Sequence, residues 1–150
     1  MSEMGNDQRA RQAIIVKRQG KLKQALLIVD HGSRRKESND LLEQIATMMR
    51  GRFGLGIVHY AHMELGEPTI QQGFDACVTE GAEEVIVLPY FLGPGRHVTT
   101  DIPDLVKQAA NRHPGIAFRI TEPLGVHPKI GEVIMERIAQ FEGAVPKISR

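Results

Sequence analysis

The sequence predicts an α/β fold: a single doubly wound, flavodoxin-like domain built on a four-stranded, mainly parallel sheet. Short apolar runs alternate with segments of helical periodicity. Each run lies about 28 to 32 residues from the next, which is the spacing of right-handed βαβ units. A chain of 150 residues, 41% of them hydrophobic, is long enough for one domain with its own core.

A basic leader precedes the first unit. The first 24 residues hold six Lys or Arg against Glu3 and Asp7, six minus two or +4, and the whole chain carries +1, which leaves −3 for the remainder. We predict a flexible extension over residues 1–23, the folded domain over 24–143 and a tail over 144–150. The small net charge gives no case for a nucleic-acid partner, and no apolar run is long enough to span a membrane.

The chain has one cysteine, Cys77, which excludes an intramolecular disulfide and a CxxC metal site. Because the sequence also lacks a signal peptide, we expect a cytoplasmic protein, or a plastid-stromal one if the source is a plant or an alga. Cys77 lies on the apolar side of a helical pattern and is expected to be a buried, inert thiol.

The strands are expected, in order, at residues 25–29, 56–61, 83–91 and 116–121. Each is a short apolar run with the length of a buried parallel strand. The helix after the first strand is expected to bury Leu41, Leu42, Ile45, Met48 and Met49.

The next helix has Pro68 near its first turn and Gly81 as its stop. The third helix begins near Thr100 and is expected to bury Ile102, Leu105, Val106 and Ala109. The last helix begins near Pro128 and is expected to turn inward Ile130, Val133, Ile134 and Ile138.

Two histidines follow strands at positions where this fold binds ligands. In open parallel sheets the ligand lies beyond the carboxyl ends of the strands, where the strand order reverses. For the order 2-1-3-4 that point lies between strands 1 and 3, which His31 and His97 follow. Two neutral imidazoles in one crevice suit a divalent metal such as Fe, Co, Ni or Zn, whereas a magnesium-phosphate site would require carboxylates.

The same edge carries acidic and basic side chains. Glu64 and Glu67 end the second strand, where a carboxylate can assist a metal or accept a proton. Guanidinium groups suit carboxylate or phosphate partners, and the two loops carry Arg34, Arg35 and Arg96. Asp101, as a helix cap, and His127, as a helix-start residue, are expected to be structural.

The motifs VDHGSRR (29–35), HMELGEPTI (62–70) and LPYFLGPGRHVTTDIP (88–103) closely resemble those of the small, single-domain class II tetrapyrrole chelatases. Within that group the chain looks most like a sirohydrochlorin chelatase over residues 24–141. The resemblance implies a lyase, similar to half of the larger two-domain chelatases, that inserts a divalent metal into sirohydrochlorin for sirohaem or cobalamin biosynthesis. It also implies a homodimer, which would close one rim over a macrocycle about 15 Å across.

The resemblance places the metal-binding histidines on His31 and His97, and the substrate-contacting glutamate on Glu67, with Glu64 second. The substrate-contacting segments it implies comprise Leu92, Gly93, Pro94, Gly95, Arg96 and His97, with Ser33, Arg34 and Arg35 from the first loop. The metal is the substrate, Fe²⁺ before Co²⁺, and no organic cofactor is expected. Some relatives have Gly where this chain has Asp30. Plant-type members carry a cysteine-rich tail, and because the residues after 141 hold no cysteine, no iron–sulfur cluster is expected.

Three alternatives remain open at this stage. The chain can be a metal or tetrapyrrole carrier without catalysis, which would keep the histidines but need no proton acceptor. It can insert Ni²⁺ into a modified sirohydrochlorin. A phosphate-handling flavodoxin-like module is disfavoured, because the first strand is followed by no acidic cluster beyond Asp30 and the third strand does not end in aspartate.

Overall fold

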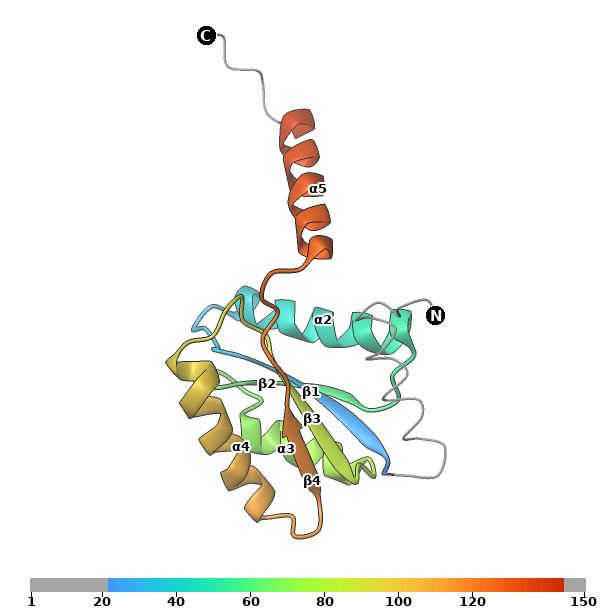
Figure 1. The fold of residues 1–150 in the computed structure, drawn as a ribbon, viewed down its shortest axis with the longest axis vertical. Coiled ribbons are helices and arrows are strands. Elements are labelled where there is room, and N and C mark those ends of the chain that lie inside the picture. Colours follow the sequence, from blue (N-terminus) through green and yellow to red (C-terminus); the bar gives the residue numbers. More distant parts are fainter. Residues whose placement is uncertain (1–21, 145–150) are drawn as a thin grey trace, which may run out of the picture.

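A computed structural model of the protein describes residues 22–144 (Figure 1). Four strands form one sheet in the order β2-β1-β3-β4, and every neighbouring pair is parallel. They are β1 (Gln24–Asp30), β2 (Val58–His62), β3 (Glu84–Pro89) and β4 (Ala117–Ile120). The predicted fold class and strand order are therefore confirmed. Nearly all of the predicted leader and the last residues of the tail lie outside the described residues.

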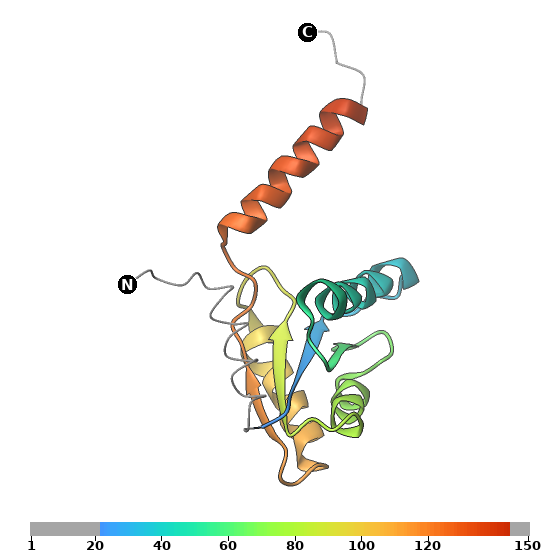
Figure 2. The same ribbon diagram turned by 90° about the vertical axis from the view of Figure 1, so that its right-hand side faces the viewer.

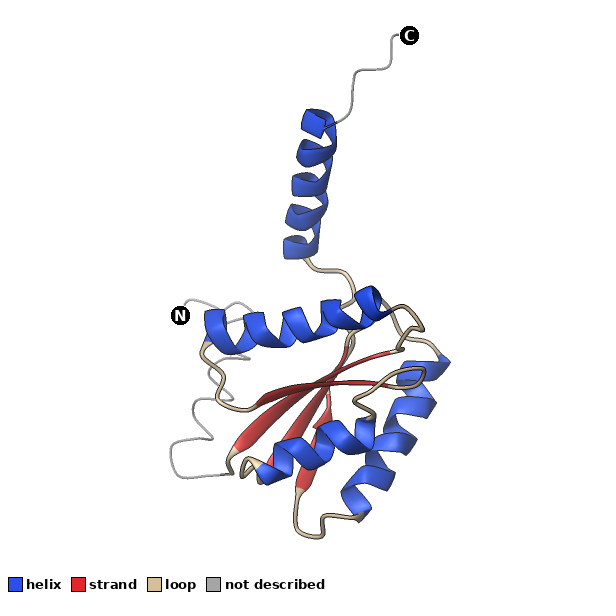
Figure 3. Ribbon diagram, turned by 180° about the vertical axis from the view of Figure 1, so that it is seen from behind, coloured by secondary structure: helices blue, strands red, loops and turns tan. Residues whose placement is uncertain are grey.

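The helices form layers on both faces of the sheet (Figure 3). One face carries α2 (Lys36–Phe53), which packs on β1 and β2. The other carries α3 (Ile70–Thr79) and α4 (Ile102–Asn111). A π-helical turn, η1 (His97–Asp101), leads directly into α4, and the chain ends in α5 (Pro128–Ala144).

Local sequence explains where two of the helices begin and end. Thr69 caps α3 by accepting a hydrogen bond from the Gln72 backbone N–H, and the Gln72 side chain accepts one from the Thr69 N–H, which makes a reciprocal capping box. Helix α2 ends at Gly54, whose left-handed backbone lets its N–H reach the Arg50 carbonyl.

The core lies mainly between the sheet and the α3–α4 layer. Val29, Val87, Phe74 and Ile102 are fully buried there, and Cys77 is buried among them as predicted. On the other face α2 contributes a narrower stripe, Leu42 and Ala46, which packs against Ile28 and Val58.

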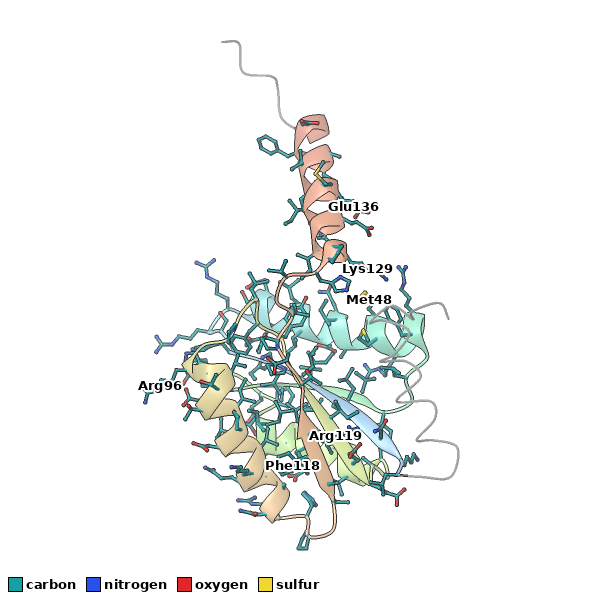
Figure 4. All side chains as sticks on the ribbon, viewed as in Figure 1. Met48, Arg96, Phe118, Arg119, Lys129 and Glu136 are labelled. Carbon is teal, nitrogen blue, oxygen red and sulfur yellow. The ribbon has the colours of Figure 1, made fainter. Side chains whose placement is uncertain are left out.

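The predicted inward face of α2 is partly wrong. Leu41 and Met48 are exposed, and Met48 lies on the side of α2 away from the sheet (Figure 4). The reason is the width of the contact: α2 rests on two strands only, so residues four apart, Leu42 and Ala46, suffice to fill it.

The predicted inward face of α5 is wrong for this chain. Helix α5 projects away from the sheet and its two helix layers (Figures 1 and 2). Ile130 at the start of α5 is half-buried, but the larger apolar side chains after it are between 44% and 64% exposed: Val133, Ile134, Met135, Ile138 and Phe141. The periodic pattern of α5 is that of a buried helix, but within the described chain nothing covers it.

A polar contact joins the ends of α3 and α4 on the far side of the core. His113 Nε2 lies 2.6 Å from Asp75 Oδ1, and the His113 ring stacks on Phe74 with centroids 5.8 Å apart. Burial opposes ionisation of Asp75 and is the largest influence on it, but hydrogen bonds from His113 and Gln71 outweigh burial and hold the Asp75 pKa below its ordinary value of 3.8.

We therefore expect the Asp75 carboxylate to stabilise the fold above pH 4 and to lose this contribution as the pH falls through 3.8 towards the lower pKa of the folded state. Because the side chain is 43% exposed, solvent screening limits the contribution to about 0.5 kcal/mol. The measurement is thermal unfolding of wild type and Asp75→Asn between pH 3 and 6. The difference should shrink on acidification, and a constant difference would contradict the linkage.

Candidate metal and substrate site

Two loops meet at the carboxyl edge of the sheet, between the neighbouring strands β1 and β3. His31 directly follows β1, and His97 begins η1. Their rings lie edge to face with centroids 4.8 Å apart. The two histidines expected at the point of strand-order reversal are therefore in contact, although 66 positions separate them in the chain.

Each histidine is oriented through its Nδ1 atom. His31 Nδ1 donates to the Gly32 carbonyl at 3.0 Å, and His97 Nδ1 donates to Asp101 Oδ2 at 2.8 Å. Because these acceptors fix the proton on Nδ1, the Nε2 lone pair of each ring is available to a metal. Asp101, expected only as a helix cap, is thus the partner of His97, and the spacing of four residues between them on a helix was the signal for it.

The second strand brings Glu64 to the same place. Glu64 Oε1 lies 3.0 Å from His31 Nε2. Backbone hydrogen bonds also link the two segments here: the Glu64 N–H donates to the His31 carbonyl at 3.0 Å and the Met63 N–H donates to the Asp30 carbonyl at 2.9 Å. A carboxylate oxygen facing an unprotonated Nε2 is stable when a cation lies between them, either a proton or a metal.

Glu67, the first choice for the substrate-contacting glutamate, lies elsewhere. It is exposed, precedes the cis peptide bond to Pro68, and forms no hydrogen bond or ion pair with another described residue. The turn over residues 63–67 separates the two glutamates, and it directs Glu64 rather than Glu67 towards the histidines. In the described structure Glu64, and not Glu67, lies beside the histidine pair.

A pocket of about 410 Å³ opens beside His97. Its lining is acidic on one side and apolar on the other: Met63, Glu64, His97, Asp101, Asp104, Leu105 and Gln108. Carboxylates that line a cleft produce a negative potential, which raises the local concentration of cations. Asp104 and Gln108 were not singled out from the sequence, because they lie about one and two helical turns beyond Asp101 and only the packing of α4 brings them to the pocket.

The basic residues lie on the rim. Arg34 and Arg35 are exposed and form no ion pair with described residues, while Ser33 is half-buried and its Oγ accepts from the Arg35 N–H at 3.0 Å. Arg96 projects into solvent at the start of η1 (Figure 4). The loop Leu92, Gly93, Pro94 and Gly95 is fully exposed. Among the described residues, the rim is thus an exposed surface with three guanidinium groups that form no ion pair there, in the two loops that carry the histidines.

The other ionisable candidates are not part of this site. His127 Nδ1 accepts from the Lys129 N–H at 3.1 Å at the start of α5, as expected of a helix-start residue. Burial raises the pKa of the Cys77 thiol to about 12, so that it is neutral. Within residues 22–144 no three His, Cys, Asp or Glu side chains are placed to hold a metal ion together, and no helix there is long and apolar enough to cross a membrane.

Residues 25–141 match the protein family CbiX. The chain is 50% identical over 113 residues to the chloroplastic sirohydrochlorin ferrochelatase of Arabidopsis thaliana, covering 75% of this chain and 50% of that protein. It is 32% identical over 115 residues to the sirohydrochlorin cobaltochelatase of Sulfurisphaera tokodaii, covering 77% of this chain and 91% of that protein.

The sirohydrochlorin chelatase SirB of Bacillus subtilis subspecies spizizenii, solved in complex with cobalt, superposes with a TM-score of 0.72 at 32% identity over 78% of this chain and 50% of that one. The chain spans half or less of the first curated relatives it matches, 50% of the Arabidopsis protein and 43% of the Priestia megaterium ferrochelatase. The match to the family extends over the whole sheet, both histidine loops and most of α5. The chain belongs to the CbiX family.

Proposed function

We propose that the protein is a sirohydrochlorin chelatase, a lyase that inserts a divalent metal into sirohydrochlorin. The observation that carries the proposal is the contact between His31 and His97: both Nδ1 atoms are engaged by protein acceptors, which leaves Nε2 of His97 for a metal and places Nε2 of His31 3.0 Å from Glu64 Oε1. Matching relatives are named sirohydrochlorin ferrochelatases and cobaltochelatases, which supports this substrate and both metals.

The histidine pair suits a metal that is a substrate rather than a resident cofactor. Two imidazoles bind a divalent ion well enough to displace part of its water shell, and they leave coordination positions for the ring nitrogens of a tetrapyrrole. The carboxylates of the adjoining pocket, Glu64 and Asp104, attract the hydrated ion. Asp101 keeps His97 in the tautomer whose Nε2 lone pair can bind the ion.

Metal insertion also displaces two protons from the inner nitrogens of the macrocycle. Glu64 is the base we propose, because its carboxylate is exposed, lines the pocket and lies 3.0 Å from His31 Nε2. When the metal leaves His31 for the macrocycle, the free imidazole and Glu64 can take up the two displaced protons, one after the other, and pass them to water.

The rim suits the edge of an acidic tetrapyrrole. Sirohydrochlorin carries eight carboxylates, and Arg34, Arg35 and Arg96 offer guanidinium partners without ion pairs to described residues. Gly93 and Gly95 lack side chains, and no described atom lies near the position of a Cβ at either residue, so the loop permits close approach of the macrocycle to the backbone.

We propose Fe²⁺ as the preferred metal and Co²⁺ as the second. The relative with 50% identity is named a ferrochelatase, which supports iron, while imidazole ligands alone do not separate these ions. The site of the reaction is proposed to be the cytoplasm, or the plastid stroma, as the name of that relative suggests for a plant or algal source.

An anaerobic absorbance assay tests the function. Sirohydrochlorin is mixed with Fe²⁺, Co²⁺ or Ni²⁺, with and without the full chain, and the spectral change on metal insertion is followed. Multiple turnovers above the uncatalysed rate support a chelatase, and the relative rates rank the metals. Binding of the tetrapyrrole without any acceleration would replace the chelatase with a carrier.

We further propose that the protein is a homodimer in which α5 of each copy packs against the exposed part of the sheet of the other copy, at β3 and β4. On the α2 face of the sheet, α2 packs on β1 and β2, while Ile86 of β3 is half-exposed and Ala117 and Arg119 of β4 are exposed. Among the described residues, each copy therefore offers an apolar helix and half of a sheet face that no other described segment covers, which is the complementarity that a two-fold exchange requires.

Charges placed on the apolar stripe of α5 should dissociate this dimer. We expect wild type to sediment as a dimer at micromolar concentration and Ile134→Asp with Ile138→Asp to sediment as a monomer, since each buried side chain contributes about 1.5 to 3 kcal/mol. Ala139→Asp, which is exposed on the opposite side of α5, is the matched control and should remain dimeric. A wild-type monomer, both alone and with tetrapyrrole, would contradict the proposal.

A further inference from the structure

A second histidine–carboxylate pair lies directly behind the site and takes no part in the chemistry proposed above. His62 ends β2, its side chain is 0% exposed, and its Nδ1 donates to Asp30 Oδ1 at 2.6 Å. Asp30 ends β1 and is partly exposed, on the side where His31 follows. The pair therefore joins the ends of the two strands that carry His31 and Glu64.

The Asp30–His62 pair lies at the end of the β1–β2 pairing, next to the site. Asp30 and His62 are register partners in the parallel pairing of β1 with β2. Beyond them the strands remain linked through the Met63 N–H to the Asp30 carbonyl and the Glu64 N–H to the His31 carbonyl. The side-chain bond is thus the last cross-strand side-chain link before the two residues whose Nε2 and Oε1 atoms lie 3.0 Å apart.

The surroundings leave this link little freedom. A Cβ added at Gly32 would lie 3.1 Å from the His62 Cβ, and one added at Gly66 would lie 3.6 Å from the His62 ring. The His62 main-chain N–H is also held, by the Pro68 carbonyl at 2.8 Å. A shift of the imidazole would therefore move the turn that carries Glu64.

Stability alone gives a weak reason for this arrangement. A buried hydrogen bond between polar side chains contributes little net stability, because desolvation of both groups offsets most of the attraction. Here His62 Nε2 is in addition buried without a hydrogen-bond partner among the described residues, which is unfavourable. What the pair does supply, and an apolar contact would not, is a fixed direction and distance between two strand ends.

We infer that Asp30 and His62 are positioning residues, whose hydrogen bond sets the distance between His31 and Glu64 and thereby the affinity of the site for its metal. The inference rests on the proposed function, since it concerns the metal of that site. Outer partners of metal ligands typically change affinity by about 10- to 100-fold when they are removed.

The test uses Co²⁺ alone as the probe and the full chain as the protein. The dissociation constant is measured by titration for wild type, His62→Leu, His62→Asn and Asp30→Ala. We expect His62→Leu and Asp30→Ala to raise the constant about 10- to 100-fold. His62→Asn, whose amide N–H can replace Nδ1 as the donor to Asp30, should restore most of the affinity.

The chain offers a matched control in His113→Leu. It breaks an equally short histidine–aspartate contact, 2.6 Å, at the far junction of α3 and α4. This variant should lower the unfolding temperature and leave the affinity for Co²⁺ unchanged. An unchanged affinity in His62→Leu and Asp30→Ala, or an equal loss in His113→Leu, would overturn the inference. If His62→Leu does not fold, Asp30→Ala decides, because that side chain is partly exposed.

A second readout separates this inference from the proposed function. The Cε1–H nuclear magnetic resonance signal of His31 reports its contact with Glu64 without any metal. If wild type binds no Co²⁺ and inserts no metal, the proposed function fails. In that case the positioning role is still supported if the His31 chemical shift changes in His62→Leu and is restored to the wild-type value in His62→Asn. An unchanged chemical shift in His62→Leu would contradict the positioning role.

Discussion

His97→Ala is expected to reduce metal insertion into sirohydrochlorin by about 100-fold or more, because it removes one of the two imidazoles available to the ion. The effect should appear in kcat and in the apparent KM for the metal. The KM for the tetrapyrrole should change little, since the guanidinium groups that face its carboxylates remain. The measurement is the anaerobic absorbance assay at varied metal and varied tetrapyrrole.

His127→Ala is the matched control for this prediction. His127 also lies beyond the carboxyl end of a strand, but its ring accepts a hydrogen bond from the Lys129 N–H at the start of α5. It should retain the wild-type rate of insertion. Equal losses in the two variants would point to the fold rather than to the metal, and a fully active His97→Ala would remove the histidine pair from the mechanism.

Gly32→Ala is expected to have the largest structural effect of any single methyl group added to the loops of the site. Gly32 has φ +93°, and an added Cβ would overlap the carbonyl oxygen of Glu64. The β1 loop and the turn that carries Glu64 would have to separate, although the backbone bond between His31 and Glu64 holds them together. We expect destabilisation of several kcal/mol and loss of metal binding.

Gly115→Ala separates the cost of the left-handed backbone conformation from the cost of the overlap with Glu64. Gly115 has nearly the same φ, +91°, but nothing lies within 4 Å of an added Cβ. It should therefore show the backbone cost alone, about 1 to 2 kcal/mol, with metal affinity unchanged. Urea unfolding and Co²⁺ titration of both variants are the measurements. Equal destabilisation would mean that close packing against Glu64 contributes nothing.

Most of the fold could be predicted from local patterns in the sequence. Apolar runs bounded by turn residues determine the strands, and the connecting helices require parallel neighbours. The positions of His31 and His97 follow from that topology, because each lies in the loop after a strand that ends at the same edge of the sheet. These features depend on residues close together in the chain and on rules common to all parallel sheets.

The choice between Glu64 and Glu67 needed the tertiary structure. Both glutamates follow β2, and the direction of each side chain depends on the turn between them, which hydrogen bonds from β1 hold in place. The same is true of the Asp30–His62 pair, since its two members lie 32 positions apart in the chain. Hydrophobic periodicity in the sequence does not predict contacts between side chains that are far apart in the chain, as these are.

Helix α5 illustrates both what the sequence predicts and what only the tertiary structure shows. Its sequence determines a helix with an apolar stripe, because side chains three and four positions apart share one face. Its direction is not encoded in that stripe, since an apolar face is satisfied equally by its own sheet or by the sheet of another copy. The tertiary structure decided that α5 leaves its own sheet, and the reason is that hydrophobic burial specifies how much surface is covered and not which chain covers it.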